Sequence, residues 1–465
     1  MKANLFKRMR TRWIPALAAA AALSLVGVGI TAPAAEAAGN INPDTPSSLT
    51  INKYDGPQGP RGDGTKIDDT SGLGTPLRGV EFTIRKVLTA NGEDVNLDTE
   101  AGWNAIDGVV VADVLDGTGF TFGPEIKVLT GADGTVTQDL DHGLYVVEET
   151  DPGPNNIVSP AQPFLVTLPL PQSGGKWLYD VNVYPKNQTN KTTPTKEVAD
   201  PSKLVLGADV TWTITAPVPD KAGDDTYRSF TITDSLDPRL TCKTIAVDGF
   251  TEGTDYTATC NGQTANIEFT STGLGKLQAG QNVVMKVTTT VNSIGDNGVI
   301  ENEATVTTNG SKVTTNKPST NWGPLELLKY ADNDKSATLG GARFEVYDSK
   351  DGQPIAELTT DENGNASITL WVGNNDVRAK DYFLKEIQAP AGYTLPADPW
   401  TGPISVSANG ENTPTTIDIS NKQKDRGELP FTGANGQLML TILGIALLLL
   451  AIGAAVVRYT RARKA

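Results

Sequence analysis

Short segments in which apolar and polar residues alternate dominate the chain between about residue 40 and residue 424. Valine, isoleucine, threonine and tyrosine recur in these segments, and glycine, asparagine, aspartate and proline separate them. Alternation with a period of two is the pattern of a half-buried strand, and few segments show the 3.6-residue period of a helix. The sequence therefore predicts an all-β chain built from tandem immunoglobulin-like sandwiches.

One alternating segment, "WLYDVNVYPKNQ", runs from Trp177 to Gln188 and contains a proline followed by a lysine. Three of its residues fall on one face at a spacing of two: Tyr179, Val181 and Val183. Pro185 ends the predicted strand, because proline cannot donate to a ladder hydrogen bond. Lys186 is then expected just past the ordered edge, exposed on a platform that the fixed proline backbone keeps rigid.

Two long apolar stretches stand at the ends of the chain. Near the N-terminus, basic residues precede "WIPALAAAAALSLVGVGI" and the small-residue stretch "APAAEAAG", which predicts a secretory signal peptide cleaved near Ala37. Near the C-terminus, "QLMLTILGIALLLLAIGAAVV" is long enough to span a bilayer. The basic residues that follow it favour a cytoplasmic end. We therefore expect an exported chain that its C-terminal helix retains transiently in the membrane.

Charge and rare residue types exclude several function classes. Residues 38–432 contain 30 lysines and arginines against 53 aspartates and glutamates, a net charge near −23. Such acidity argues against nucleic acid and anionic membrane as partners. His142 is the single histidine and no CxxC spacing occurs, so we expect no metal site, no cofactor and no histidine-dependent hydrolase. Cys242 and Cys260 are predicted to form a disulfide after export, the alternative being two reduced buried thiols.

Polar seams rich in proline, threonine and asparagine divide the exported part. They occur at "KNQTNKTTPTKEVADPS" and "TTNKPSTNWGP", and a polar stalk "KQKDRGE" precedes the C-terminal apolar stretch. The predicted organisation is a signal peptide at 1–38, domains at 40–188, 189–321 and 322–424, and a stalk with the C-terminal signal and helix at 425–465.

The first and third predicted domains are similar to each other. "LTINKY" (Leu49–Tyr54) parallels "LELLKY" (Leu325–Tyr330), each with a lysine at the end of a first strand. "LYVVEETDPG" parallels "YFLKEIQAPAGY", which places Glu149 opposite Glu386. "NVYPK" likewise parallels "DISNK". The shared order of these segments indicates an internal repeat.

The third domain carries a lysine, a glutamate and an asparagine on strands that can be neighbours. If Lys329, Glu386 and Asn421 meet in the apolar core, desolvation lowers the lysine pKa and raises the glutamate pKa. The neutral amine can then attack the asparagine side chain, expel ammonia and leave an amide. The segment "YFLKEIQAPAGY" resembles the E-box of CnaB-type domains. The resemblance implies that Lys329 and Asn421 are joined and that Glu386 is the catalyst; the alternative is three unrelated surface, turn and strand residues.

The middle domain resembles the CnaA type through "TKEV", "ENEATV" and "FTITDSLDPRL". The resemblance implies a Lys196–Asn302 bond assisted by Asp234. Lys191 competes with Lys196 for the role of the amine donor.

The first domain departs from this pattern. Aligning "NVYPK" on "DISNK" puts Pro185 where Asn421 stands, so the acceptor amide is absent. We therefore expect no cross-link between Lys53 and a partner assisted by Glu149. Asn187, two positions further on, could serve only after a shift in register.

Two further motifs resemble those of sortase-assembled pili. The segment "WLYDVNVYPK" matches the pilin motif, with Trp177, Val181, Val183, Tyr184, Pro185 and Lys186 at the matching positions. The segment "LPFTG" resembles the sorting signal of Gram-positive surface proteins: Leu429, Pro430, Phe431, Thr432 and Gly433. In that family, a sortase cleaves between the residues matching Thr432 and Gly433, and the lysine matching Lys186 attacks the acyl-enzyme.

Together these motifs resemble a Gram-positive major pilin, similar to actinobacterial fimbrial major subunits. The resemblance implies a structural subunit and not a multi-turnover enzyme, polymerised head to tail and attached to the cell wall. The implied partners are a pilin sortase, other copies of the chain, a housekeeping sortase with peptidoglycan, and minor tip or base pilins; the sequence names no adhesion receptor. The alternative is a monomeric wall-anchored adhesin. Replacing Lys186 distinguishes the two, because only a polymerised pilin would then lose its ladder of high-mass multimers.

Two weaker signals remain open. Arg61-Gly62-Asp63 can be read as an integrin-type tripeptide, although so short a match arises by chance. The segments "YADNDKS" and "TDENGNA" place oxygen atoms near turns, which a calcium site and ordinary turn chemistry explain equally well.

Overall fold

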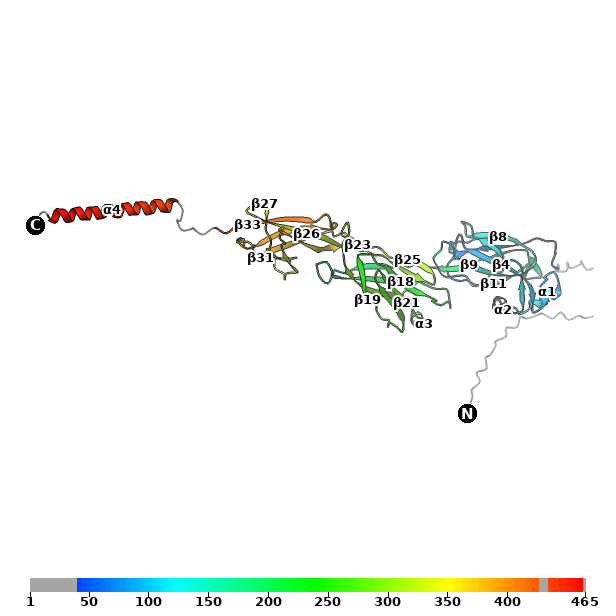
Figure 1. The fold of residues 1–465 in the computed structure, drawn as a ribbon. Helices are drawn as coiled ribbons and strands as arrows, with labels where there is room; N and C mark the ends of the chain where they lie inside the picture. The colour runs from blue at the N-terminus through cyan, green and yellow to red at the C-terminus, as the bar shows by residue number, and fades with distance from the viewer. Residues whose placement is uncertain (1–39, 426–433, 463–465) are drawn as a thin grey trace, which may run out of the picture.

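The computed structural model describes residues 40–425 and 434–462. Three β-sheet units follow one another along a line, and a long helix lies beyond the third (Figure 1). The prediction of an all-β chain with a C-terminal helix is confirmed. The signal peptide and the "LPFTG" pentapeptide lie outside the described residues.

The first unit is made of three main sheets, with strand orders β14-β1-β8, β10-β15-β2-β3 and β11-β9-β4-β5, and β6 and β7 also pair with β4. The bounds in the first two sheets are β1 (Ser47–Asn52), β2 (Tyr54–Asp55), β3 (Thr75–Pro76), β8 (Thr135–Leu140), β10 (Ile157–Ser159), β14 (Asp180–Val183) and β15 (Lys186–Thr189). Those in the third are β4 (Glu81–Ala90), β5 (Glu93–Asp94), β6 (Phe120–Phe122), β7 (Ile126–Leu129), β9 (Gly143–Asp151) and β11 (Phe164–Leu168). A small hairpin joins β12 (Leu170–Gln172) to β13 (Lys176–Leu178).

The alternating pattern of the first strand shows why this unit folds as a sandwich. In β1, Leu49 and Ile51 point into the core, while the residues between them are only partly covered. A strand pairs on both sides of β1: β14 in parallel, with Leu49 opposite Val181, and β8 antiparallel. The first and last parts of the unit are therefore neighbours, as in the third unit described below.

The second unit packs two sheets against a core centred on Trp212, with strand orders β16-β17-β22-β19 and β20-β21-β18-β24-β25. The bounds are β16 (Thr195–Val198), β17 (Asp209–Pro217), β18 (Phe230–Ser235), β19 (Leu240–Val247), β20 (Tyr256–Asn261), β21 (Thr264–Phe269), β22 (Asn282–Val291), β24 (Ala304–Thr308) and β25 (Ser311–Thr314). A short helix, α3 (Ser271–Leu274), follows β21.

The third unit is organised by one long strand, β26 (Ser319–Ala331), with which every other strand of its sheet pairs. These other strands are β23 (Val299–Glu301), β27 (Asp334–Thr338), β30 (Asn365–Asn374) and β33 (Thr415–Asn421). The facing sheet has the order β29-β28-β31-β32: β28 (Arg343–Tyr347), β29 (Ala356–Thr359), β31 (Ala379–Gln388) and β32 (Trp400–Ser407). Strand β33 pairs with β26 in parallel, so first and last strands are again adjacent.

Both junctions between units carry specific contacts. At the first, Asp55 accepts hydrogen bonds from the backbone N–H of Thr189 at 3.1 Å and from its hydroxyl at 2.8 Å, and pairs with Lys191 at 2.8 Å. At the second, β26 continues from its pairing with β23 into the third unit, and Trp322 is fully buried there. These contacts fix the linkers that join the units.

The helices of the described residues are short, apart from the last. Helices α1 (Glu100–Ala105) and α2 (Val111–Asp116) form an insertion between β5 and β6 that the alternating pattern did not predict. Helix α4 (Ala434–Ala462) contains a span, Leu438–Arg461, that is long and apolar enough to cross a membrane, with a mean hydropathy of 2.8.

Candidate functional site: three buried lysine–acid–asparagine clusters and a lysine at the surface

In the third unit, the structure brings the three predicted side chains together in the core. Lys329 Nζ donates to Glu386 Oε2 at 2.9 Å and to Asn421 Oδ1, and Asn421 Nδ2 donates to Glu386 Oε1 at 2.6 Å. The side chains come from β26, β31 and β33, and at most 2% of each residue is exposed. Phe344 covers the ammonium, with its ring centre 5.4 Å away. Burial lowers the pKa of Lys329, which favours the neutral, nucleophilic amine.

In the second unit, the predicted residues also meet. Lys196 Nζ donates to Asp234 Oδ2 at 2.6 Å, and Asn302 Nδ2 donates to the same oxygen at 3.2 Å. Desolvation lowers the pKa of Lys196 to about 8 and raises the pKa of Asp234. The Trp212 ring lies 5.4 Å from the lysine nitrogen and closes the cluster from one side.

The rival donor, Lys191, lies elsewhere. Its amine is exposed and pairs with Asp55 of the first unit at 2.8 Å. Lys196 is therefore the lysine that shares a buried site with Asp234 and Asn302.

In the first unit, the prediction that the acceptor amide is absent is wrong. Lys53 Nζ lies 2.8 Å from Glu149 Oε2 and donates to Asn187 Oδ1, and Asn187 Nδ2 donates to Glu149 Oε1 at 2.6 Å. Lys53 and Asn187 are fully buried, and burial lowers the pKa of Lys53 to about 8. The backbone N–H of Ala161 also donates to Asn187 Oδ1, at 2.6 Å, and polarises that carbonyl.

The error has a physical cause in the strand register. In the third unit, Lys329 pairs with Ile419, and the acceptor asparagine follows two residues later. In the first unit, Tyr54 pairs with Lys186, so Lys53 stands opposite Pro185, and Asn187 again follows two residues later. The correct alignment is therefore two residues from the one that matched "NVYPK" to "DISNK". Pro185, which cannot donate to the ladder, occupies the break between β14 and β15 and hides this offset.

All three clusters have the parts needed for one reaction. A neutral lysine amine can attack the asparagine Cγ, and a C–N bond forms while the amide nitrogen leaves as ammonia. The carboxyl group contacts both the attacking and the leaving nitrogen in each cluster, so it can take the proton from one and deliver it to the other. The apolar surroundings strengthen these contacts and exclude water.

Lys186 lies next to the cluster of the first unit, on the opposite side of the strand. It is the first residue of β15 and pairs with Tyr54, so the expectation that it lies past the ordered edge is wrong. Because successive side chains of a strand point to opposite faces, burial of Asn187 directs Lys186 outward. Its side chain is half-buried and not freely exposed. The strand therefore fixes the face of the sheet from which this side chain leaves the backbone.

Other residues of the "WLYDVNVYPK" segment anchor it to the first unit. Val181 is buried, Trp177 packs 5.4 Å from Trp103 of α1, and the Tyr184 hydroxyl accepts from the backbone N–H of Ile67 at 2.7 Å. The loop that contains Ile67 also holds Arg61-Gly62-Asp63, and the carbonyl oxygen of Gly64 accepts from the Asn182 N–H at 2.8 Å. The tripeptide thus lies in a loop that lines the edge of β14.

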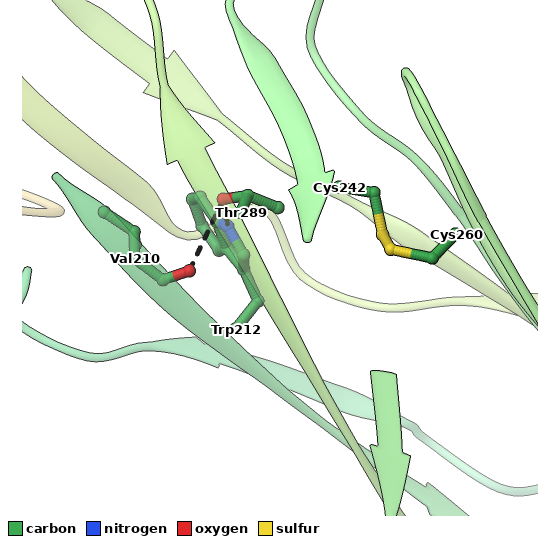
Figure 2. Close-up of a disulfide and its surroundings, with 5 residues drawn as sticks. All are labelled: Val210, Trp212, Cys242, Cys260 and Thr289. Atoms are coloured by element: carbon green, nitrogen blue, oxygen red, sulfur yellow. Dashed lines mark hydrogen bonds between the residues drawn. A yellow bond between two sulfur atoms is a disulfide. The ribbon is translucent and has the colours of Figure 1, made fainter. Parts of the chain in front are cut away.

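The predicted disulfide is confirmed (Figure 2). It joins Cys242 of β19 to Cys260 of β20, edge strands of the two facing sheets, with Cα atoms 5.4 Å apart. Figure 2 also shows the indole of Trp212, whose Nε1 donates to the Thr289 hydroxyl at 3.0 Å. The disulfide therefore links the two sheets of the second unit at the edge formed by β19 and β20. Lys196 lies on β16, at the opposite edge of the sheet that contains β19.

In the two oxygen-rich turns, aspartate oxygens accept hydrogen bonds from backbone N–H groups. Asp361 Oδ1 accepts from the N–H groups of Asn363 and Asn365, and Asp334 Oδ1 accepts from Ser336. Within residues 40–425 and 434–462, no group of three histidine, cysteine or acidic side chains is arranged to hold a metal ion.

Tandem β-sandwiches with buried lysine–acid–asparagine clusters, followed by a polar stalk and an apolar helix, define a class of multidomain pilins. Three family models match successive parts of the chain: "Gram-positive pilin subunit D1, N-terminal domain" at residues 45–188, "Sgo0707 N2 domain" at 191–321, and "Prealbumin-like fold domain" at 323–423.

Similar whole proteins agree with this class. The chain is 33% identical to "Fimbrial subunit type 2" of Actinomyces naeslundii, over 97% of both chains. It is 30% identical to "Fimbrial subunit type 1" of Actinomyces viscosus, over 97% of this chain and 96% of the other. The solved full-length major pilin SpaD of Corynebacterium diphtheriae superposes with a TM-score of 0.64 at 27% identity, over 84% of this chain and 100% of SpaD. The chain belongs to the family of Gram-positive fimbrial subunits, the major pilins that form a cell-surface pilus.

Proposed function

We propose that this pilin polymerises through an amide between Lys186 Nζ of one copy and the Thr432 carbonyl carbon of another, formed by a pilin sortase. The observation that carries the proposal is the placement of Lys186: an amine held at the surface by the same strand that buries Asn187. The sorting signal supplies the acyl group, and the apolar helix that follows it retains the precursor in the membrane until cleavage.

The same geometry supports an internal amide in each unit, joining Lys53 to Asn187, Lys196 to Asn302, and Lys329 to Asn421. Two of these amides, in the second and third units, form part of the shortest covalent path from Lys186 to Thr432. Tension applied at the two ends would pass from Lys196 directly to Asn302 and from Lys329 directly to Asn421. The intervening strands of the second and third units would therefore stay folded under force.

The Lys53–Asn187 bond has a different place in this path. Force on the Lys186 side chain reaches the backbone one residue from Asn187, whereas residues 40–185 of the first unit lie outside the route to the next unit. An amide at Asn187 would tie β15 to the first unit and prevent the strand from being pulled away from β2 and β10.

At the cell surface, the last copy is attached by a housekeeping sortase to peptidoglycan, and the fibre serves adhesion. A head-to-tail contact between two different surfaces of the same chain repeats without closing, so it generates a filament. Minor tip or base pilins and a receptor on the target surface are the further partners of the fibre.

The test is the ladder of covalent multimers formed with the pilin sortase. Lys186→Arg keeps the positive charge but removes the reactive amine, so we expect the ladder to disappear and monomers to remain wall-anchored. Lys221→Arg is the matched control, since Lys221 is also a half-buried surface lysine near the first junction, and the ladder should persist. A ladder that survives Lys186→Arg unchanged would favour another acceptor, and the absence of any ladder in the parent chain would favour the monomeric adhesin.

A further inference from the structure

One hydrogen bond of the first cluster comes from the backbone of a neighbouring segment. The N–H of Ala161 donates to Asn187 Oδ1, with 2.6 Å between the nitrogen and the oxygen. The same N–H lies 3.3 Å from Glu149 Oε2, so it faces the carbonyl and the acid together and is closer to the carbonyl. Ala161 is 7% exposed and Asn187 is fully buried, so this contact is made in surroundings from which water is excluded.

The reaction changes the donors that the carbonyl oxygen has. In the structure, Lys53 Nζ also donates to Asn187 Oδ1. When the neutral amine attacks, its lone pair points to Cγ, a C–N bond forms, and the electron pair of the C=O bond moves to Oδ1. Glu149 carries one proton from Nζ to Nδ2, the Cγ–Nδ2 bond breaks, and ammonia leaves. While Oδ1 is negative, the Ala161 N–H is the donor that remains on it among the described residues.

The other two clusters lack such a backbone donor. In the third unit, the attacking amine of Lys329 is itself the donor to Asn421 Oδ1 among the described residues. In the second unit, Asn302 Oδ1 has no hydrogen-bond partner within residues 40–425 and 434–462. The backbone donor is therefore a feature of the first unit and not of all three clusters.

The sequence around Ala161 keeps its N–H out of the strand ladder. Strand β10 pairs with β15 and ends at Ser159, and the segment that follows has prolines at Pro160 and Pro163. A proline fixes its own φ and restricts the residue before it to extended conformations. The segment is therefore stiff, and the antiparallel register carries it alongside Asn187. Because no strand partner uses the Ala161 N–H, it is free to meet the asparagine side chain.

The second unit holds β10 in this position. The Ser159 hydroxyl accepts from the Ala222 N–H at 3.2 Å, and the carbonyl oxygen of Val158 accepts from Asn309 Nδ2 at 3.0 Å. Both contacts cross the first junction, and they lie two and three residues before Ala161. The donor is thus fixed before the reaction begins and needs no reorganisation when charge develops on the oxygen.

We propose that the Ala161 N–H is the oxyanion donor of the first unit, which stabilises the negative charge on Asn187 Oδ1 while the Lys53–Asn187 amide forms. The inference rests on that proposed amide and adds a catalytic group to its formation. Loss of one such donor slows an acyl-transfer enzyme by about 100- to 1000-fold.

Replacing the backbone amide by an ester tests the donor. Lactic acid at position 161, introduced during cell-free synthesis of the full chain, puts an oxygen where the N–H stood and keeps the methyl group. Peptide mass mapping of quenched samples gives the rate at which the branched Lys53–Asn187 peptide appears. We expect this rate to fall by about 100-fold or more.

The matched control carries lactic acid at position 101. Ala101 is exposed and is the second residue of α1, so its N–H has no partner within the helix. Its ester should leave the rate at the parent value. Equal rates for the two ester chains would overturn the donor and leave the amide intact, whereas a parent chain that never joins Lys53 to Asn187 would overturn both.

The dependence of the rate on pH separates the two groups that the N–H faces. If the N–H acts on the carbonyl oxygen, the ester chain should be slower by the same factor at every pH. A shift in the pH at which the rate changes would mean that the N–H acts through the protonation of Glu149, and would overturn the proposal.

A second measurement uses the native chain, in case the ester prevents the first unit from folding. Hydrogen exchange resolved to single residues should show the Ala161 N–H exchanging more slowly than that of its exposed neighbour Gln162, by about 100-fold or more. Equal exchange at the two positions would mean that the hydrogen bond to Asn187 is not made, and would contradict the donor.

Discussion

In the first unit, the predicted reaction between Lys53 and Asn187 depends on the Glu149 carboxylate. Glu149→Gln preserves the shape of the side chain but removes the carboxylate that contacts both Lys53 and Asn187. Without it, no group can carry the proton from the amine to the leaving ammonia, so we expect the first unit to remain without its amide.

The chemical magnitude follows from the reaction. Each internal amide removes about 17 Da and the disulfide about 2 Da, so the parent ectodomain should fall short of its sequence mass by about 53 Da. The Glu149→Gln chain should fall short of its own sequence mass by about 36 Da. Intact-mass spectrometry resolves the difference directly.

The energetic magnitude follows from the loop that the bond closes. Lys53 and Asn187 are 134 residues apart, and a cross-link over such a loop stabilises the fold by about 5 kcal/mol in the chain-entropy estimate. A loss of that size lowers the melting temperature of a unit of this length by about 10–20 °C. We expect calorimetry to show this loss in the transition of the first unit alone.

Glu148→Gln is the matched control. Glu148 is the preceding residue of β9, is half-buried, and pairs with Arg85 at 2.6 Å outside the cluster. Its substitution should leave the shortfall at about 53 Da and move the transition by only a few degrees. A Glu149→Gln chain that keeps the full shortfall would refute the role of Glu149 in the reaction, and a parent chain that shows only two ammonia losses would refute the third cross-link.

Three further predictions concern the other units. Reducing Cys242–Cys260 should cost the second unit about 3 kcal/mol for its 18-residue loop, yet leave the multimer ladder intact because the bridge lies outside the covalent path; fragmentation of the ladder by reductant would contradict that path. In Asn302→Ala, which leaves Lys196 as a free amine, the folded pKa of about 8 lies below the ordinary value of 10.5, so the unfolded chain binds more protons between these values. Its free energy of unfolding should rise by a few kcal/mol from pH 8 to pH 10.5, as denaturant titrations would show, whereas a flat profile would argue against a buried amine. Glu386→Ala should reduce the mass shortfall by about 17 Da, and an unchanged mass would exclude this residue as the catalyst.

Residue types and their order were enough to predict much of the site. Lys329, Glu386 and Asn421 lie in segments that recur in the same order in the first unit, and the structure places the three side chains in contact. The disulfide followed from two cysteines in an exported chain. Alternation alone predicted the fold class, since period two is visible without knowing which strands pair.

Register and insertions could not be read in the same way. Pro185 interrupts the last strand of the first unit, and the residues beyond it rejoin a different sheet as β15. A local alignment therefore matches Pro185 to Asn421, although the true counterpart, Asn187, lies only two residues further on. The signal that would have found it is the pairing rule: the acceptor follows by two residues the position that faces the lysine.

The half-burial of Lys186 was also beyond the sequence. Gln58, far from Lys186 along the chain, donates to its backbone carbonyl oxygen at 3.4 Å, and a contact between such distant segments cannot be read from the local sequence. The sequence pattern did not predict helices α1 and α2, because each has only six residues, which is too few to show a 3.6-residue period.

The most direct test of head-to-tail joining is a peptide map of fimbriae taken from cells. Proteolysis and tandem mass spectrometry should recover one branched peptide in which the Thr432 carbonyl is amide-linked to Lys186 Nζ, in nearly every copy of the fibre. Recovery of Lys186 as an unmodified side chain, with Thr432 joined to a different lysine or to peptidoglycan in most copies, would contradict it.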